Sequence, residues 1–218
     1  MNKFLCFLTA ACCFSQINAQ QLAANFDYST FNGATPYLET YISVNASTIV
    51  FSEQKHGKYQ GKIGIELMLT DNDGATKFFD KYELLSPELL DSVQVDFHFI
   101  DQQRIALPEG NYILNLNIVD ANSDDDPYTH QQEISFWSAK KTAFSSIQFV
   151  ESYQKNKTKS IINKNGIDLK PMPSNVYYEE HNTLHFYTEL YNLPEASVFS
   201  YYIASAETNQ IVGNLAKS

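Results

Sequence analysis

The residues best suited to chemistry form one acidic run, Asp120-Ala121-Asn122-Ser123-Asp124-Asp125-Asp126. Asp120, Asn122 and Asp124 have the alternating oxygen spacing with which a calcium-binding loop begins. The rest of that pattern is missing, because Asp125 replaces the glycine of the sixth position and Gln131 replaces the glutamate of the twelfth. The run favours a solvated acidic turn, with Ca²⁺ bound by Asp120, Asn122 and Asp124 as the alternative. No other cofactor is expected.

Other catalytic chemistry has weak support in the sequence. His181 and His185 have the spacing of a zinc-binding pair, but zinc proteases need it on a helix with an intervening glutamate, which His181-Asn182-Thr183-Leu184-His185 lacks. The chain has neither the Gly-x-Ser-x-Gly turn that presents a nucleophilic serine nor a glycine-rich phosphate loop. We therefore predict that the protein is not an enzyme.

Aromatic residues offer a binding surface instead. The sequence contains 14 tyrosines and 15 phenylalanines. Tyrosine rings can stack on sugars, although most tyrosines in strands are half-buried packing residues. The candidate platforms for a glycan are Tyr37, Tyr41, Tyr177, Tyr178, Tyr201 and Tyr202.

The elements that would position these residues are β-strands. Segments rich in Tyr, Phe, Ile, Val and Thr alternate in polarity and are separated by turns. In residues 20–137 the pattern predicts strands at 25–31, 37–44, 48–53, 59–70, 76–85, 93–100, 113–120 and 134–137. Eight short strands with such turns indicate an immunoglobulin-like antiparallel β-sandwich, so the fold class is all-β. Gly57 and Gly74 are expected to supply positive φ angles in two hairpin turns.

A tyrosine after a tight corner adds to this assignment. Pro108 and Gly110 bend the chain in Leu107-Pro108-Glu109-Gly110-Asn111-Tyr112. In immunoglobulin-like sandwiches a tyrosine at this place tucks its ring inside and bonds to the upstream backbone. We predict a structural role for Tyr112.

A second, shorter β-rich domain is predicted at 138–218. Its strand-like segments lie at 144–153, 160–169, 184–191, 198–205 and 210–215. That number falls short of the roughly seven strands that an immunoglobulin-like sandwich carries. Three explanations are open: the second domain packs against the first, a partner completes it, or the chain is a truncated form of a longer protein.

The first 19 residues predict export. Lys3 precedes an apolar run from Phe4 to Phe14, and Ile17 and Ala19 occupy the positions that a signal peptidase reads. The run is shorter than the ~20 residues of a transmembrane helix, and no transmembrane segment is expected elsewhere. Cleavage after Ala19 would remove all three cysteines, so neither a disulfide nor a thiol nucleophile is expected. A lipoprotein anchor at Cys12 is the minor alternative. The expected location is the periplasm, the cell surface or the medium.

The charge balance excludes one class of partner. The formal net charge is −10, and Arg104 is the only arginine. Nucleic-acid binding draws most of its affinity from basic residues on phosphates, so no nucleic-acid partner is expected.

The layout of the chain resembles the N-terminal part of bacterial GWxTD-type envelope proteins. The segments that carry the resemblance are the strand Ile113 to Asp120 with its corner, Asn165-Gly166, Pro171 to Ser174, Tyr177, Leu184 to Glu189 and Tyr191-Asn192-Leu193. The Gly-Trp-x-Thr-Asp motif itself is absent, because the only tryptophan, Trp137, lies between Phe136 and Ser138. The resemblance implies a sandwich architecture and an envelope location, and it transfers no site residue.

Together these patterns predict an exported, non-enzymatic interaction or scaffold module of the bacterial cell envelope. Its expected partner is an envelope protein, which would add a strand to an open sheet edge. The alternative is a carbohydrate-binding β-sandwich module with a glycan ligand.

Overall fold

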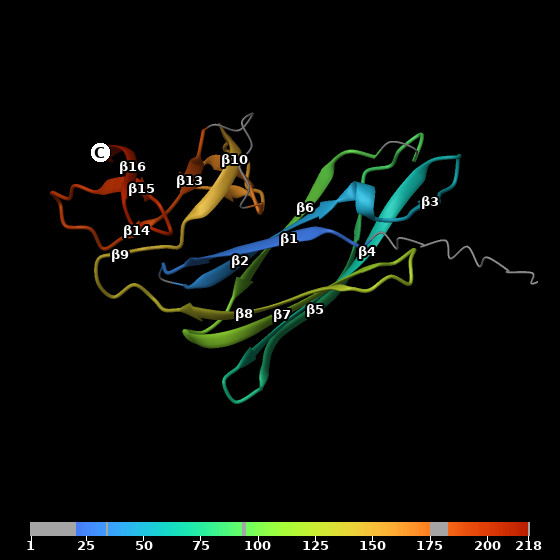
Figure 1. Cartoon of the computed structure of the whole chain (residues 1–218). Helices are drawn as coiled ribbons and strands as arrows, with labels where there is room; N and C mark the ends of the chain where they lie inside the picture. Colours follow the sequence, from blue (N-terminus) through green and yellow to red (C-terminus); the bar gives the residue numbers. More distant parts are fainter. Residues whose placement is uncertain (1–20, 34, 93–94, 175–182, 218) are drawn as a thin grey trace, which may run out of the picture.

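The computed structural model describes residues 21–33, 35–92, 95–174 and 183–217, and the described chain is all-β (Figure 1). Its strands pair antiparallel throughout. The only helical element among the described residues is a single 3₁₀ turn, η1 (Ala46–Thr48). Among those residues no helix combines the length and the apolar character required to span a membrane.

Residues 24–136 form an immunoglobulin-like β-sandwich, as predicted. One sheet has the order β1-β2-β6, with β1 (Ala24–Phe31), β2 (Tyr37–Asn45) and β6 (His98–Ala106). The other sheet is built around β4, which pairs with β3, β5 and β7, while β8 pairs with β7. Its strands are β3 (Phe51–Glu53), β4 (Tyr59–Asp71), β5 (Thr76–Leu85), β7 (Gly110–Asp120) and β8 (Tyr128–Phe136).

The sandwich core follows from alternation along the strands. On β4 the odd-numbered residues from Gly61 to Leu69 are buried, and on β7, its antiparallel neighbour, the even-numbered residues face the same side. Successive side chains of a strand point to opposite faces, so one face of each strand packs inside. The innermost side chains include Leu38, Ile42, Ile63, Ile65, Leu67, Leu69, Leu114, Ile118 and Ile134.

The bounds of two sandwich strands were predicted wrongly. The sequence pattern places a strand at 93–100, whereas β6 runs from His98 to Ala106 and pairs with the whole of β2. Residues 93–94 lie outside the described part. The stretch from Asp101 to Arg104 has a polar sequence, which is typical of a loop. It is polar because Gln102 and Arg104 point away from the sandwich core and take part in a polar contact described below. The last sandwich strand also begins earlier than predicted, at Tyr128.

Both predicted hairpin glycines adopt left-handed backbone angles. Gly57 has φ of 71° and Gly74 has φ of 79°. These angles suit glycine, which lacks the Cβ atom that disfavours them in other residues. The turn at 71–75 lies at the end of β4 beside the start of β7, whereas Asp120 ends β7, so the two acidic turns lie at opposite ends of the sheet.

Tyr112 occupies the predicted corner. Its ring is buried, and its hydroxyl donates a hydrogen bond to the carbonyl oxygen of Pro108 at 2.7 Å. This bond ties the start of β7 to the corner that precedes it, so the structural role of Tyr112 is confirmed.

Replacing Tyr112 with phenylalanine is expected to lower the free energy of unfolding by about 1 kcal/mol, because one hydrogen bond of a buried hydroxyl is lost without a change in packing volume. Urea unfolding followed by fluorescence measures the difference. Tyr128→Phe is the matched control, because within the described chain its hydroxyl donates no hydrogen bond. Equal effects of the two changes would contradict a special role for the corner.

Eight short strands follow the sandwich in the described chain, rather than the five predicted. These strands form a four-stranded sheet of order β11-β12-β10-β13, a separate pair β14-β9 and a separate hairpin β15-β16. Their bounds are β9 (Ala143–Phe144), β10 (Gln148–Lys155), β11 (Asn163–Lys164), β12 (Ile167–Pro171), β13 (His185–Tyr187), β14 (Leu190–Tyr191), β15 (Ser200–Ala204) and β16 (Ile211–Lys217). We call residues 138–217 the C-terminal region.

Candidate functional site

The C-terminal region packs on the outer face of the β1-β2-β6 sheet. Strand β2 is therefore buried on both faces: Leu38 and Ile42 face the sandwich core, while Glu39 and Tyr41 face the C-terminal region. Backbone bonds support this junction, since Ser146 N–H donates to the Thr30 carbonyl and Ala139 N–H donates to that of Asn32. The outer face of β2, which would be solvent-exposed in an isolated sandwich, is thus an internal surface.

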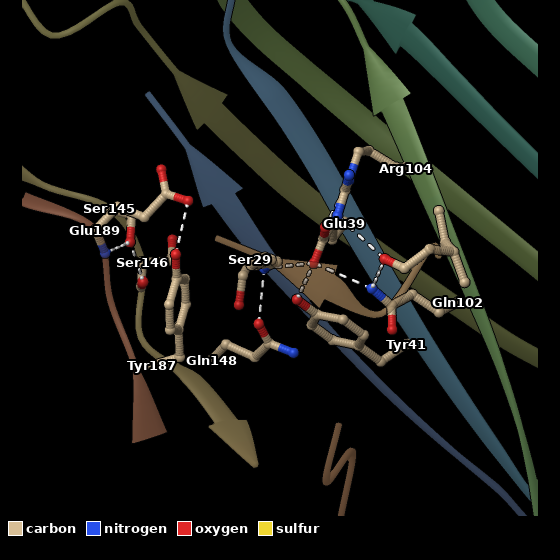
Figure 2. A network of polar contacts seen from close by, with 12 residues as sticks. Ser29, Glu39, Tyr41, Gln102, Arg104, Ser145, Ser146, Gln148, Tyr187 and Glu189 are labelled. Carbon is tan, nitrogen blue, oxygen red and sulfur yellow. Dashed lines mark hydrogen bonds and ion pairs between the residues drawn. The ribbon is translucent and has the colours of Figure 1, made fainter. Parts of the chain in front are cut away.

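A buried carboxylate, that of Glu39, lies at the centre of this junction (Figure 2). It accepts hydrogen bonds from Tyr41 Oη at 2.8 Å and from Gln102 Nε2 at 3.2 Å. It also forms ion pairs with Arg104 Nη2 at 2.6 Å and with Lys164 Nζ at 2.7 Å. These five residues, Glu39, Tyr41, Gln102, Arg104 and Lys164, are called the junction cluster.

Lys164 is the contribution of the C-terminal region to the cluster. It lies on the short strand β11, and its side chain is only 3% exposed. Its ammonium group also donates to Gln148 Oε1 at 2.7 Å and lies 3.4 Å from the centre of the Phe31 ring. Burial lowers the pKa of Lys164 to about 8, because desolvation disfavours the charged form more than Glu39 favours it.

A second carboxylate, that of Glu189, binds two tyrosine side chains nearby. Glu189 accepts hydrogen bonds from Tyr187 Oη at 3.0 Å and from Tyr191 Oη at 2.7 Å. Tyr191 Oη in turn accepts a bond from the backbone N–H of Asn32, which follows β1. Burial and the Glu189 charge raise the pKa of Tyr187 to about 12, and the same two influences raise the pKa of Tyr191. These contacts extend the polar junction along β1.

The junction cluster is suited to holding two parts of the chain in one relative position. A buried ion pair gains little net stability over a hydrophobic contact, but breaking one partner away leaves an uncompensated buried charge. Its hydrogen bonds have defined directions, so they favour one arrangement of the C-terminal region on the sandwich. The Glu39 carboxylate is occupied by partners within the cluster, an arrangement suited to positioning the two parts of the chain.

The C-terminal hairpin β15-β16 forms a different kind of surface. All five residues of β15 are exposed, and both faces of the hairpin carry large apolar side chains. Tyr202, Ile203 and Val212 are 58%, 57% and 58% exposed. Strand β15 pairs only with β16 among the described strands, and the rings of Phe186 and Tyr201 pack edge to face with their centroids 5.6 Å apart. In Figure 1 the hairpin lies at the end of the molecule away from β3 and β4.

The acidic run after β7 is tied to the neighbouring strand. Asp120 is buried and accepts hydrogen bonds from Val50 N–H at 2.6 Å and from Asn122 N–H at 2.9 Å. The Asn122 side chain donates to the Val50 carbonyl oxygen at 2.9 Å, whereas Asp124 is exposed. No cluster of three His, Cys, Asp or Glu side chains able to hold a metal is found within the described ranges. Calcium binding by Asp120, Asn122 and Asp124 stays a prediction.

The other predicted site residues are scattered. His181, Tyr177 and Tyr178 lie outside the described residues. Tyr41 is buried in the junction cluster, and Tyr37 is half-buried, stacked on Phe31 with Arg104 over its ring. His185 packs edge-on against Tyr153. Of the predicted sugar platforms that the structure describes, Tyr201 and Tyr202 are exposed, and both lie on the β15-β16 hairpin.

Sequence reasoning missed the junction cluster. The one available signal is Glu39 itself, which lies between Tyr37 and Tyr41 on the second face of a strongly alternating strand. A carboxylate between aromatic neighbours can equally lie on a solvated face. Nothing in the sequence pairs it with Lys164, which is 125 positions away.

Comparison with known proteins gives no relative from which to argue. No protein-family model matches the chain, and no curated protein matches it significantly. The resemblance to GWxTD-type envelope proteins therefore stays a prediction.

Proposed function

We propose that this protein is an exported, non-enzymatic interaction module of the bacterial cell envelope. The leader sequence supports export, and no catalytic motif was found in the sequence. The observation that carries the proposal is the β15-β16 hairpin, in which all of β15 together with Ile211 and Val212 is exposed, and which pairs with no other strand that the structure describes. An isolated two-stranded hairpin is marginally stable in water, so a hairpin rich in exposed apolar residues gains from further pairing.

The proposed partner is an extended strand of another envelope protein. Strand addition satisfies the free backbone groups of an edge and gives alternate side chains of the added strand a surface to pack on. The hairpin, residues 200–217, contains one acidic and one basic residue, Glu207 and Lys217, so apolar side chains dominate its surface. A strand with apolar residues on one face would complement these side chains.

Changing Ile203 and Val212 to glutamate is expected to abolish capture of the partner. The two residues oppose each other across the hairpin, and both are exposed, so the change adds charge without burying it. A photo-reactive residue at position 202 in the producing cells should give one discrete adduct, which mass spectrometry identifies. The adduct should disappear in the double variant.

The matched control is Phe79→Glu with Leu85→Glu. These two side chains on β5 are each 53% exposed, so the change in charge and apolar area is similar. The adduct should persist in this control. An adduct that survives both pairs of changes, or one formed equally from position 79, would contradict the proposal, as would an adduct consisting of two copies of this chain.

The second candidate function is carbohydrate binding, and the exposed rings of Tyr201 and Tyr202 favour it. Exposed aromatic rings provide flat apolar faces on which sugar rings can stack. Glycan-array binding that is lost in Tyr202→Ala and retained in Phe79→Ala would support it. An array without signal would exclude this function for the glycans displayed.

A further inference from the structure

A basic pocket lies beside the junction cluster. It has a volume of about 480 Å³ and is lined by Arg104, Lys157, Lys159, Ser160 and Gly166, with two asparagines. Pockets of this size can hold a small ligand. Three cations around one pocket are unusual in a chain with 25 acidic and 15 basic residues.

The loop that carries the two lysines is held by hydrogen bonds. The two oxygens of Asp168 accept from Asn156 Nδ2 at 2.6 Å and from Asn163 Nδ2 at 2.7 Å. Asn156 Oδ1 accepts from Thr158 N–H at 2.9 Å, between the two lysines. These bonds lower the pKa of Asp168, which keeps its carboxylate ionised and engaged with the loop. The loop is thus shaped before any ligand arrives.

The sandwich supplies the third cation. Arg104 Nη2 and Gln102 Nε2 both donate to the carbonyl oxygen of Ile161, at 3.1 and 3.3 Å. These bonds attach the lysine-bearing loop to β6. The contacts of Arg104 with Glu39 and Ile161 use Nε and Nη2, and in the described part of the chain no hydrogen bond is made by Nη1. Arginine has five N–H donors, so part of its guanidinium group remains for a ligand.

The charge at this pocket is only partly balanced. Glu39 is shared between Arg104 and Lys164. Lys157 and Lys159 form no ion pair with any residue that the structure describes, and both are exposed. Phosphate and sulfate groups accept hydrogen bonds on several oxygens and pair well with an arginine fork and with lysine ammonium groups.

We propose that this pocket binds a tetrahedral oxyanion, the phosphate or sulfate group of a small ligand, between Arg104, Lys157 and Lys159. The hydroxyl of Ser160 and the exposed Asn165 at the rim offer polar groups to the remainder of such a ligand. The proposal is independent of the function proposed for the β15-β16 hairpin, which is a separate surface.

The test is a titration of inorganic phosphate into the whole chain. Binding is monitored by calorimetry and by the amide signals of Ser160 and Gly166. The double variant Lys157→Ala, Lys159→Ala is expected to weaken binding about tenfold or more, since it removes two charge-assisted contacts. Lys140→Ala with Lys141→Ala is the control, because it changes the net charge equally at exposed positions away from the pocket. Near-ultraviolet circular dichroism checks that both variants are folded.

Glucose 6-phosphate and glucose distinguish the source of the oxyanion. Tighter binding of the sugar phosphate than of inorganic phosphate, with no binding of glucose, would assign the pocket to a phosphorylated sugar. Equal binding of the two phosphates would assign it to the free anion. Equal weakening by the two lysine pairs would show a general charge effect and overturn the proposal, as would the absence of phosphate binding.

Discussion

Replacing Glu39 with glutamine is expected to lower the free energy of unfolding by about 3 to 5 kcal/mol, the range found when one member of a buried ion pair is removed. Glutamine has nearly the same shape but no charge. It would leave Lys164 without its carboxylate and Arg104 without its buried partner. Urea denaturation measures the loss, because urea does not screen charges as a guanidinium salt does.

The control for this experiment is Glu66→Gln. Glu66 pairs with Lys81 at 3.1 Å on an exposed part of the sheet, where the two side chains are 38% and 70% exposed. Exposed ion pairs contribute about 0 to 1 kcal/mol, so this change should be nearly neutral. Similar losses in the two variants would contradict the central position assigned to Glu39.

Lys164→Met should be much milder at pH 7 than Glu39→Gln. Glu39 keeps Arg104 when Lys164 is removed, and the lowered pKa of Lys164 means that its environment disfavours the charge. The double variant should regain part of the stability lost in Glu39→Gln, because the unpaired lysine is gone. A double-mutant cycle isolates this coupling. Strictly additive effects would show that the two groups do not interact.

The second large effect is a rise in stability at alkaline pH that depends on Lys164. The folded protein holds this lysine at a pKa of about 8, below the usual lysine value of 10.5. Between these values the unfolded chain binds more protons than the folded chain, so stability increases as pH rises. This gain in stability is complete above the pKa that Lys164 has in the unfolded chain, and it is lost as the pH falls through 8. Between pH 8 and pH 10 we expect about 2 kcal/mol from this group.

The comparison with Lys164→Met separates this effect from that of the tyrosines. Burial raises the pKa of Tyr37, Tyr41 and Tyr191 above the usual value of 10. Their ionisation in the unfolded chain lowers stability above pH 10, in the variant as in the wild type. The difference in unfolding free energy between the two proteins should therefore rise from pH 8 to pH 10. A constant difference would show that Lys164 titrates normally.

Substituting either Glu39 or Lys164 should also loosen the packing of the C-terminal region on the sandwich. The junction cluster connects that region to the sandwich through the Glu39–Lys164 ion pair, and the β15-β16 hairpin belongs to the same region. Hydrogen exchange of the β10 and β12 amides would report such loosening in Glu39→Gln. Phosphate binding at the basic pocket should weaken as well, because Gln102 and Arg104 help to hold the loop that carries its lysines.

Much of the sandwich follows from local patterns. Alternation along β4 and β7 assigns their inner faces, and Gly57 and Gly74 mark turns that need positive φ angles. The corner before Tyr112 identifies its hydrogen bond to Pro108. These features depend on neighbours in the sequence, so the residue types contain enough information to predict them. The polar half of β6 could not be predicted in this way, because its side chains contact residues that are distant in the sequence.

The sequence by itself therefore determined the all-β class, the sandwich core, its turns and the absence of a recognisable catalytic motif. Only the tertiary structure decided that the second face of β2 is buried, that Glu39 meets Lys164, and that Arg104 joins Lys157 and Lys159 around one pocket. Strand periodicity reports which residues share a face, but it does not say what covers that face. The partners here are more than fifty residues apart in the sequence, and their pairing arises only when the C-terminal region packs on the sandwich.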